Sequence, residues 1–424
     1  MKIESKIVFW TSIGHFCNHI GNYLTPALLI YLQTDIPLSQ TERGILGSIP
    51  MIILVLLSSL VGWLGDNYPI WKKHMIWVGI IGIGFFGFFI SFANTFFDLA
   101  ITTAVLGVAL STYHPLAFTF INTMENKDRN MGINAVSGNV GSAVTPLISM
   151  ILAVFWGWRM AFLTFSLFQI LIGLSFALVF PNDQITHSNL NNFTQKEHEH
   201  EVPFADSHFF ILSILLVLIS AARAPVFRCI SYFTTVIFKD AFLFTNVESS
   251  IFSAATLGIG AFATFLMGTL NNRKATKGVG RDDRVNFRIN SILLSNGASA
   301  VLLTLLVLTP KSSTLAILII YILLSFFFFL GAAILPTILS EVTGPSHGMA
   351  SSMGVLFTGA TLTGAVAPTI FGFLADELGF EVSFLFLGSV AFTCLILIFL
   401  FKFVYQSLIN QNESESSVAG RRVL

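Results

Sequence analysis

Charged residues are scarce in this sequence of 424 residues: Asp, Glu, Lys and Arg make up only 10% of it, whereas hydrophobic residues make up 54%. Soluble domains carry about a quarter charged residues, so this composition excludes an ordinary soluble domain and predicts an integral membrane protein. Acidic and basic residues balance to a formal net charge of zero. That balance argues against a nucleic-acid partner, which would favour a strongly basic chain.

Other features are missing as well. The three cysteines lie singly in apolar runs, without the paired spacing of metal or redox sites, and we expect buried structural thiols. No nucleotide-binding loop occurs, so ATP is not expected to drive this chain. No small-residue cleavage site follows the first apolar stretch, which we interpret as a retained first span. We therefore expect neither an enzyme nor a bound cofactor.

Apolar runs of about 20 residues, the length needed to cross a bilayer as a helix, recur along the chain. Twelve are found, at approximately 7–32, 44–64, 75–95, 99–122, 133–155, 159–180, 208–237, 248–270, 290–309, 314–340, 348–374 and 381–405. Most Lys and Arg lie in the loops on the side of the two termini, which predicts that both termini are cytoplasmic. The fold class is thus an all-α integral membrane protein.

The longest polar stretch, 181–207, divides the twelve runs into two sets of six and is interpreted as a cytoplasmic linker. This predicts an N-terminal six-helix bundle (1–180), a C-terminal six-helix bundle (208–405) and a cytoplasmic tail (406–424). The two halves also repeat each other, because Pro146 and Gly157 each precede a matching residue by 222 positions, Pro368 and Gly379. Two pseudo-symmetric bundles of the same orientation are expected.

The segment "GWLGDNYPIWKK" (62–73) resembles the signature loop of the major facilitator superfamily between its second and third helices. The match is partial, since Asn67 stands where that family has arginine. The resemblance implies a secondary transporter in which Asp66 helps to latch the cytoplasmic ends of the halves. The residues that we predict to act in gating are Asp66, Lys72, Lys73, their counterparts Asn272 and Arg273, and Glu341 at the inner end of the tenth span. An interfacial turn with a capping carboxylate is the alternative for this loop.

Four further segments are similar to the fosmidomycin-resistance-type branch of that superfamily: "GHFCNHIGNYLTPALL", "YHPLA", "GNVGSAVTPL" and "TILSEVTGPSHGMASSMGV". The resemblance implies proton-coupled export of a drug or metabolite. Two carboxylates usual in that branch are absent, since His19 and Leu116 stand where acidic residues are expected.

No acidic residue lies in the middle of a predicted span, so the titratable groups within the membrane are histidines. His15, His19 and Asn22 follow one another at helical spacing and form a polar stripe, with Asn18 beside it. His114, after Tyr113, lies at a comparable depth in the fourth span. Because histidine titrates near pH 6.5, about the physiological range, we predict proton coupling by His15, His19 and His114. Histidines satisfied by neighbouring polar groups and serving only helix packing are the alternative.

Arg223 and Arg228 are the fixed cations of the seventh span. Each arginine near the bilayer centre costs about 2.5–3.5 kcal/mol by insertion scales, which suggests a wet cavity or an anion. Pro225 between them favours a kink, and a separation of five residues turns by about 140°, so both need not face one cavity. The predicted substrate-binding residues are Arg223, Arg228, Asn18, Asn22, Tyr113 and Tyr232. Structural pairing of the arginines with carbonyls or a helix dipole is the alternative.

The resulting hypothesis is a transporter of a small anionic molecule in a bacterial inner membrane, monomeric, with protons as possible coupling ions and lipid as its surroundings. Proton-coupled export is preferred, and facilitated diffusion, uptake or anion exchange is the alternative. Two remoter classes are an intramembrane histidine metal site and a receptor that does not transport. The metal site is disfavoured because Arg223 would repel a cation and no thiol or carboxylate completes a ligand set.

Overall fold

The computed structural model describes residues 3–122, 124, 127–181, 206–276, 279–332, 334–342 and 349–422, and every regular element within them is helical. The N-terminal half contains α1 (Ile3–Leu32), α2 (Gln40–Asn67), the short η1 (Pro69–Trp71), α3 (Lys72–Ile90), α4 (Phe96–Ser111), α5 (Tyr113–Asn122), α6 (Lys127–Trp156) and α7 (Trp158–Val179). The C-terminal half contains α9 (Asp206–Tyr232), α10 (Thr234–Val236), η2 (Ile237–Ala241), α11 (Asn246–Thr276), α12 (Arg281–Leu308), α13 (Thr314–Leu330), α14 (Ile334–Val342), α15 (Met349–Leu378) and α16 (Phe380–Arg422).

These helices coincide with the predicted spans, and three spans are broken. The fourth divides into α4 and α5 at Thr112, and the tenth into α13 and α14 near Gly331. The seventh breaks near its end, at Phe233, where α9 gives way to the short α10 and η2. The linker residues 182–205 lie outside the described residues, and α16 continues as helix through most of the segment that we expected to form a tail. Among the described residues, nine helices are long and apolar enough to cross a membrane. That all twelve segments cross, with both termini cytoplasmic, stays a prediction.

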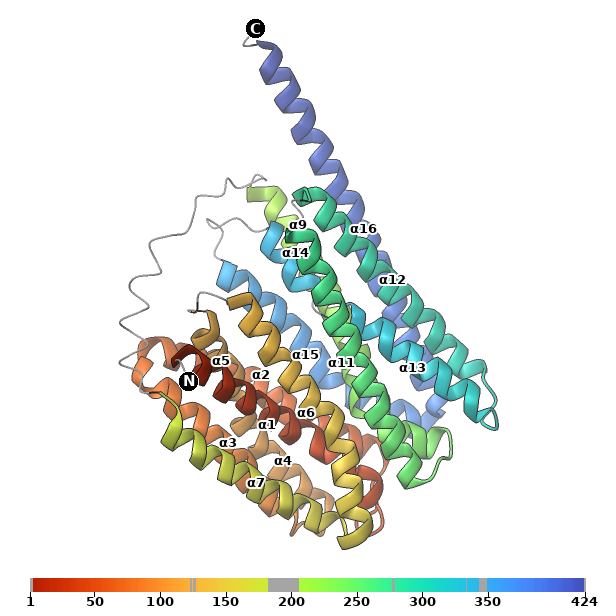
Figure 1. The fold of residues 1–424 in the computed structure, drawn as a ribbon. Coiled ribbons are helices and arrows are strands. Elements are labelled where there is room, and N and C mark those ends of the chain that lie inside the picture. The colour runs from red at the N-terminus through yellow and green to blue at the C-terminus, as the bar shows by residue number, and fades with distance from the viewer. Residues whose placement is uncertain are drawn as a thin grey trace.

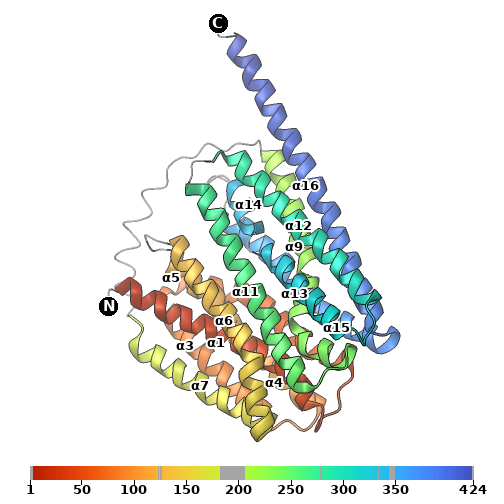
Figure 2. The same ribbon diagram turned by 45° about the vertical axis from the view of Figure 1, so that its right-hand side comes forward.

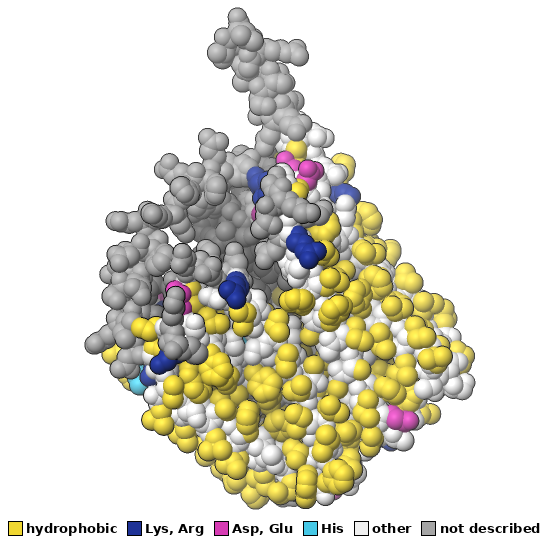
Figure 3. Space-filling model, viewed as in Figure 1, with side chains coloured by type: hydrophobic (Ala, Val, Ile, Leu, Met, Phe, Trp, Pro, Cys, Tyr) yellow, Lys and Arg dark blue, Asp and Glu magenta, His cyan; other side chains and the backbone are white. Residues whose placement is uncertain are grey.

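Large apolar side chains cover the outside of both halves. Figure 3 shows them over most of the visible flank, with Lys and Arg gathered toward the upper part of the view. Leu178 is 85% exposed and Phe403 is 72% exposed, values that water would penalise and lipid would not. The surface therefore fits an integral membrane protein.

The internal repeat extends to backbone conformation. Gly157 begins the turn into α7 with φ of +85°, and Gly379 begins the turn into α16 with φ of +89°. L residues with a side chain rarely adopt this conformation, so both positions favour glycine. The sequence match across 222 residues thus has a structural reason.

The two halves form a V (Figures 1 and 2), converging at the end where α1 leads into α2 and lying further apart at the end where the chain termini emerge. The closest packing between halves joins α2 to α15 and α6 to α11. At the converging end, backbone meets backbone, since a Cβ on Gly44 of α2 would lie only 2.2 Å from the Pro368 carbonyl oxygen of α15. The converging end is therefore closed.

Candidate functional site

The polar stripe of α1 faces α5 and α6 within the N-terminal half. His15 Nδ1 lies 2.8 Å from the Asn134 carbonyl oxygen, and His19 Nδ1 lies 2.7 Å from Ser142 Oγ. Close approach of α6 is possible because Gly138 has no side chain: a Cβ there would lie 2.7 Å from His15 Nε2. Both histidines of α1 are thus anchored to α6 through one ring nitrogen each.

His114 of α5 completes a cluster of three histidines. Its ring centroid lies 5.1 Å from that of His15 and 6.2 Å from that of His19, and the His15 and His19 centroids are 4.6 Å apart. One ring nitrogen from each residue lies within 4.8 Å of those of the other two. His15 is buried, whereas His19 and His114 are partly exposed. The break between α4 and α5 carries His114 at the start of α5, next to the stripe.

Tyr113 and Asn18 contact this cluster from the packed side. Tyr113 stacks on His15 with centroids 5.3 Å apart, and its hydroxyl donates to the Thr11 carbonyl and accepts from Asn134 Nδ2. Asn18 Nδ2 donates to the Leu110 carbonyl at 3.1 Å, in the last turn of α4. Both side chains are almost fully buried, at 1% and 2% exposure. Their polar atoms are therefore used in joining helices of the N-terminal half.

Arg223 lies inside the C-terminal half. Its guanidinium donates to the Phe328 carbonyl at 2.8 Å and to Ser295 Oγ at 3.2 Å, and it lies over the Phe328 ring at 4.6 Å. A Cβ on Gly331 would lie 2.7 Å from Arg223 Nη1, so this glycine makes room for the cation at the break of the tenth span. The negative end of the α13 dipole stabilises a cation here. This contact set is the structural pairing that the sequence left as the alternative.

Arg228 faces the opposite way and reaches the N-terminal half. Its Nη2 lies 3.2 Å from Asn22 Oδ1 and 3.5 Å from the Gly47 carbonyl oxygen, and its guanidinium lies 5.4 Å from the centre of the Tyr232 ring. The side chain is 7% exposed, its Nε has no hydrogen-bond partner, and no carboxylate of the described residues pairs with it. Such a buried cation, with a nitrogen left unsatisfied, is suited to receive an anion.

Tyr232 occupies a packing position beside Arg228. Its hydroxyl donates to the Arg43 carbonyl at 3.0 Å, and a Cβ on Gly47 would touch its ring at 2.6 Å. The structure thus brings His15, His19 and His114 together in the N-terminal half, and it brings Arg228 of the C-terminal half to Asn22, less than one helical turn from His19. It places the other predicted substrate residues in helix packing: Arg223, Asn18, Tyr113 and Tyr232.

The predicted gating residues make contacts within their own halves. Lys72 Nζ lies 3.7 Å from Asp66 Oδ1, and Lys73 donates to the Phe180 carbonyl at 2.8 Å. Glu341 accepts a hydrogen bond from Arg284 at 2.9 Å and forms an ion pair with Arg288 at 2.7 Å, which joins α14 to α12. Arg273 is exposed on the last turns of α11, and the side chain of Asn272 lies outside the described residues. A role in gating stays a prediction for all six.

The closed end contains a latch that sequence reasoning missed, made by Arg43, Asp240, Asp376, Gln40 and Thr41. Arg43 of α2, which is fully buried, pairs with Asp240 of η2 at 2.5 Å. Asp376 of α15 accepts from the backbone amides of Gln40 and Thr41 at 2.9 and 2.7 Å, and so caps the first turn of α2. These pairs join residues about 200 and 335 positions apart, so neither local spacing nor hydropathy could reveal them.

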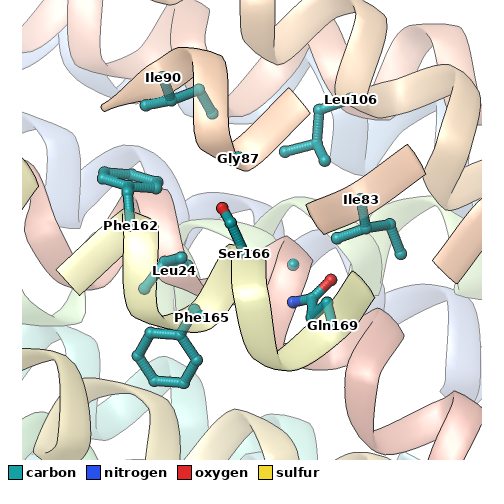
Figure 4. Close-up of a pocket in the computed structure, with 10 residues that line it drawn as sticks. Leu24, Ile83, Gly87, Ile90, Leu106, Phe162, Phe165, Ser166 and Gln169 are labelled. Atoms are coloured by element: carbon teal, nitrogen blue, oxygen red, sulfur yellow. The ribbon is translucent and has the colours of Figure 1, made fainter. Parts of the chain in front are cut away.

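A small internal cavity lies within the N-terminal half, between α1, α3, α4 and α7. Figure 4 shows its lining, in which Ser166 and Gln169 of α7 are the polar side chains among apolar ones such as Ile83 and Leu106. Ser166 Oγ and Gln169 Oε1 have no hydrogen-bond partner. Bound water would satisfy them, and the cavity lies away from the contacts of Arg228.

Comparisons with known proteins agree on one family. The sequence model described as Major Facilitator Superfamily matches residues 11–352 and 281–421. The protein named probable sulfoacetate transporter SauU of Cupriavidus necator is 24% identical over 422 residues, which cover 92% of each chain. The nitrite extrusion protein of Bacillus subtilis is 28% identical over 138 residues, 32% of this chain and only 34% of that protein.

Solved structures agree on the fold. A bacterial homologue of the human lysosomal transporter Spinster, in an inward-facing and occupied conformation, superimposes with a TM-score of 0.71 at 15% identity over 96% of this chain and 98% of that one. The nucleoside transporter NupG gives a TM-score of 0.67 at 14% identity over 95% and 100%. At such identities the likeness concerns the fold alone.

Proposed function

Because the chain belongs to the major facilitator superfamily and is a membrane transporter rather than an enzyme, we propose that it moves a small anion by alternating access. Arg228 is the cation that binds the anion, and Asn22 and the histidine face of α1 line the same region. The observation that carries this proposal is the burial of Arg228 between the halves without a carboxylate partner among the described residues. An anion would supply the missing charge.

Two comparisons support an anionic substrate. The relative matched over 92% of both chains is named for sulfoacetate, and the shorter match is named for nitrite, and both substrates are anions. A guanidinium presents two parallel N–H groups to a carboxylate or sulfonate, and such charge-assisted pairs contribute about 1.5–3 kcal/mol. Of the two arginines that we expected to bind substrate, Arg228 therefore takes the central role.

Export coupled to protons remains the preferred direction, with His19 and His114 as the coupling groups. With the termini cytoplasmic, the latched end is the outer one, and the V opens toward the cytoplasm, from which an exporter loads. An imidazolium in the cluster would be stabilised by an anion held at Arg228, which would link proton occupancy to substrate occupancy. The fosmidomycin-resistance-type branch, the bacterial inner membrane and the monomeric state stay predictions within this proposal.

The test is counterflow in proteoliposomes with labelled sulfoacetate and nitrite as probes. Replacing Arg228 by Gln should weaken apparent affinity for a transported probe by about 10- to 100-fold, the equivalent of one charge-assisted pair. Arg228→Lys should recover part of the loss, because it restores charge but not the planar fork. Arg159→Gln is the matched control, since Arg159 pairs with Asp35 at the outer end of the N-terminal half.

Two results would reject the proposal: no counterflow of either anion by the folded wild-type protein, or unaltered affinity in Arg228→Gln. Coupling is tested separately with His19→Gln and His114→Gln. If both variants keep the wild-type pH dependence of transport, facilitated diffusion or anion exchange replaces proton coupling.

A further inference from the structure

The hydrogen bond of His15 fixes which of its ring nitrogens carries the proton, and the hydrogen bond of His19 is compatible with the same assignment. A carbonyl oxygen only accepts, so His15 Nδ1 must donate to the Asn134 carbonyl, and the neutral ring then has a lone pair on Nε2. That Nε2 is buried and has no partner. The Ser142 hydroxyl lies 2.7 Å from His19 Nδ1 and 3.3 Å from the Gly138 carbonyl oxygen, and it can donate to either. When it donates to Gly138, His19 Nδ1 donates to Ser142 Oγ, and the lone pair of His19 is then also on Nε2.

This arrangement is the one that metal-binding histidines show, with one ring nitrogen donating to an oxygen and the other left to bind the ion. His114 adds a third ring and forms no hydrogen bond with the residues that the structure describes. We infer that His15, His19 and His114 bind a divalent transition-metal ion such as Zn²⁺ through three neutral imidazoles. Three histidines with the fourth position open form a known type of zinc site.

The geometry permits this with small movements. Tetrahedral bonds of about 2.0–2.1 Å place ligand nitrogens about 3.3 Å apart, whereas one ring nitrogen of each histidine, Nδ1 or Nε2, lies within 4.8 Å of those of the other two. His15 is held by Asn134 and stacked on Tyr113, so it is the fixed ligand. His19 and His114 are partly exposed and can rotate inward.

A metal ion and a coupling proton compete for the same lone pairs, so a metal bound here would replace His19 and His114 as proton-coupling groups. One proton can bridge the lone pairs of two imidazoles, which leaves the third lone pair without a partner. A metal ion can bind the lone pairs of all three imidazoles. No acidic residue occurs between positions 5 and 34 or between 99 and 124 to stabilise an imidazolium. Arg228 contacts Asn22, less than one helical turn from His19, and disfavours any cation that brings no anion with it. The open fourth position therefore suits a small anion that faces Arg228.

The experiment uses the purified full-length protein, with any affinity tag removed, titrated with Co²⁺ and followed by visible absorption. Tetrahedral Co²⁺ absorbs much more strongly than octahedral Co²⁺. We expect a strong band that saturates at one Co²⁺ per chain, disappears on addition of Zn²⁺ and weakens at low pH, because only neutral imidazole binds metal. His19→Gln and His114→Gln, each verified as folded by thermal unfolding, should lose the band.

Other histidines provide the controls. His74→Gln alters an exposed histidine of α3, and the double variant His198→Gln, His200→Gln alters the linker; both should keep the band. A weak octahedral spectrum, or a band lost with the linker variant and kept in His19→Gln, would overturn the inference. The metal readout needs no transport, so a failure of anion counterflow leaves this inference standing, and the absence of a Co²⁺ site leaves the transport proposal standing.

Discussion

Neutralising Asp240 should open the latched end of the transporter. Arg43 is fully buried, and its carboxylate partner Asp240 has a side chain that is 23% exposed. Asp240→Asn keeps an oxygen that can accept a hydrogen bond but removes the charge, which leaves a buried guanidinium without a counter-ion. Two other guanidinium nitrogens, Nε and Nη2, already lack partners, so they cannot compensate.

The expected cost follows from measurements on buried ion pairs. Removing one partner destabilises by about 3–5 kcal/mol, and the partial exposure of Asp240 places this pair near the lower limit. A cost of about 3 kcal/mol on the closed state alone shifts the balance between closed and open by about 150-fold. The variant should therefore populate a conformation in which the latched end is open far more often than the parent does.

Cysteine labelling can measure this shift, because all three native cysteines are fully buried. Ser250, which is also fully buried, contacts Tyr31 across the closed end at 3.2 Å, and a single Ser250→Cys reports opening there. The rate of maleimide labelling at this position should rise by up to about 100-fold when Asp240→Asn is added. Asp35→Asn, which alters an exposed pair within one half, is the control. Unchanged labelling, or an equal rise in the control, would refute the reasoning.

Two further predictions concern Asp376 and Arg223. Burial alone would raise the pKa of Asp376, but hydrogen bonds from the Thr41 side chain and from the Thr41 and Gln40 amides outweigh it and lower the pKa below its ordinary value. This contact is therefore intact above the ordinary carboxyl range and is lost as pH falls through the lowered pKa. Labelling at Ser250→Cys, divided by the labelling rate of a free thiol at the same pH because maleimide reacts with the thiolate, should rise in acid. Asp376→Asn should show that rise already at neutral pH and abolish its acid component. Arg223→Met should lower the thermal stability of the protein, because the Phe328 carbonyl loses a buried hydrogen-bond partner, which costs about 1–3 kcal/mol. The folded variant should keep its apparent anion affinity. Reduced affinity at unchanged stability would contradict the packing role.

Much of the architecture follows from the sequence because a bilayer imposes a simple rule. Runs of about 20 apolar residues must form helices, since lipid cannot satisfy exposed backbone groups. The repeat of Gly157 and Gly379 was also visible in the sequence, and both glycines have positive φ. The breaks at Thr112 and near Gly331 were not predicted, because a break in an apolar run leaves hydropathy unchanged.

The candidate site was predictable in its residue types and only partly in its arrangement. Helical spacing placed His15 and His19 on one stripe, and hydropathy marked Arg223 and Arg228 as costly. Spacing also gave the angle of about 140° between the two arginines, but which of them faces the N-terminal half depends on how α9 packs against other helices. The histidine cluster likewise depended on His114, whose ring reaches α1 only through the break before α5.

The breaks in the fourth and tenth spans explain why polar side chains lie deep in each half. A broken helix in lipid leaves carbonyl oxygens that water cannot reach, and each half supplies a donor from its first helix. Asn18 of α1 donates to the Leu110 carbonyl near the end of α4, and Arg223 of α9 donates to the Phe328 carbonyl near the end of α13. Since Asn18 and Arg223 make the same kind of contact in the two halves, a buried arginine is not by itself evidence of an anion site. Arg228 differs because its neighbours come from the other half and leave one of its nitrogens unsatisfied, and this contrast is the reason to assign anion binding to Arg228.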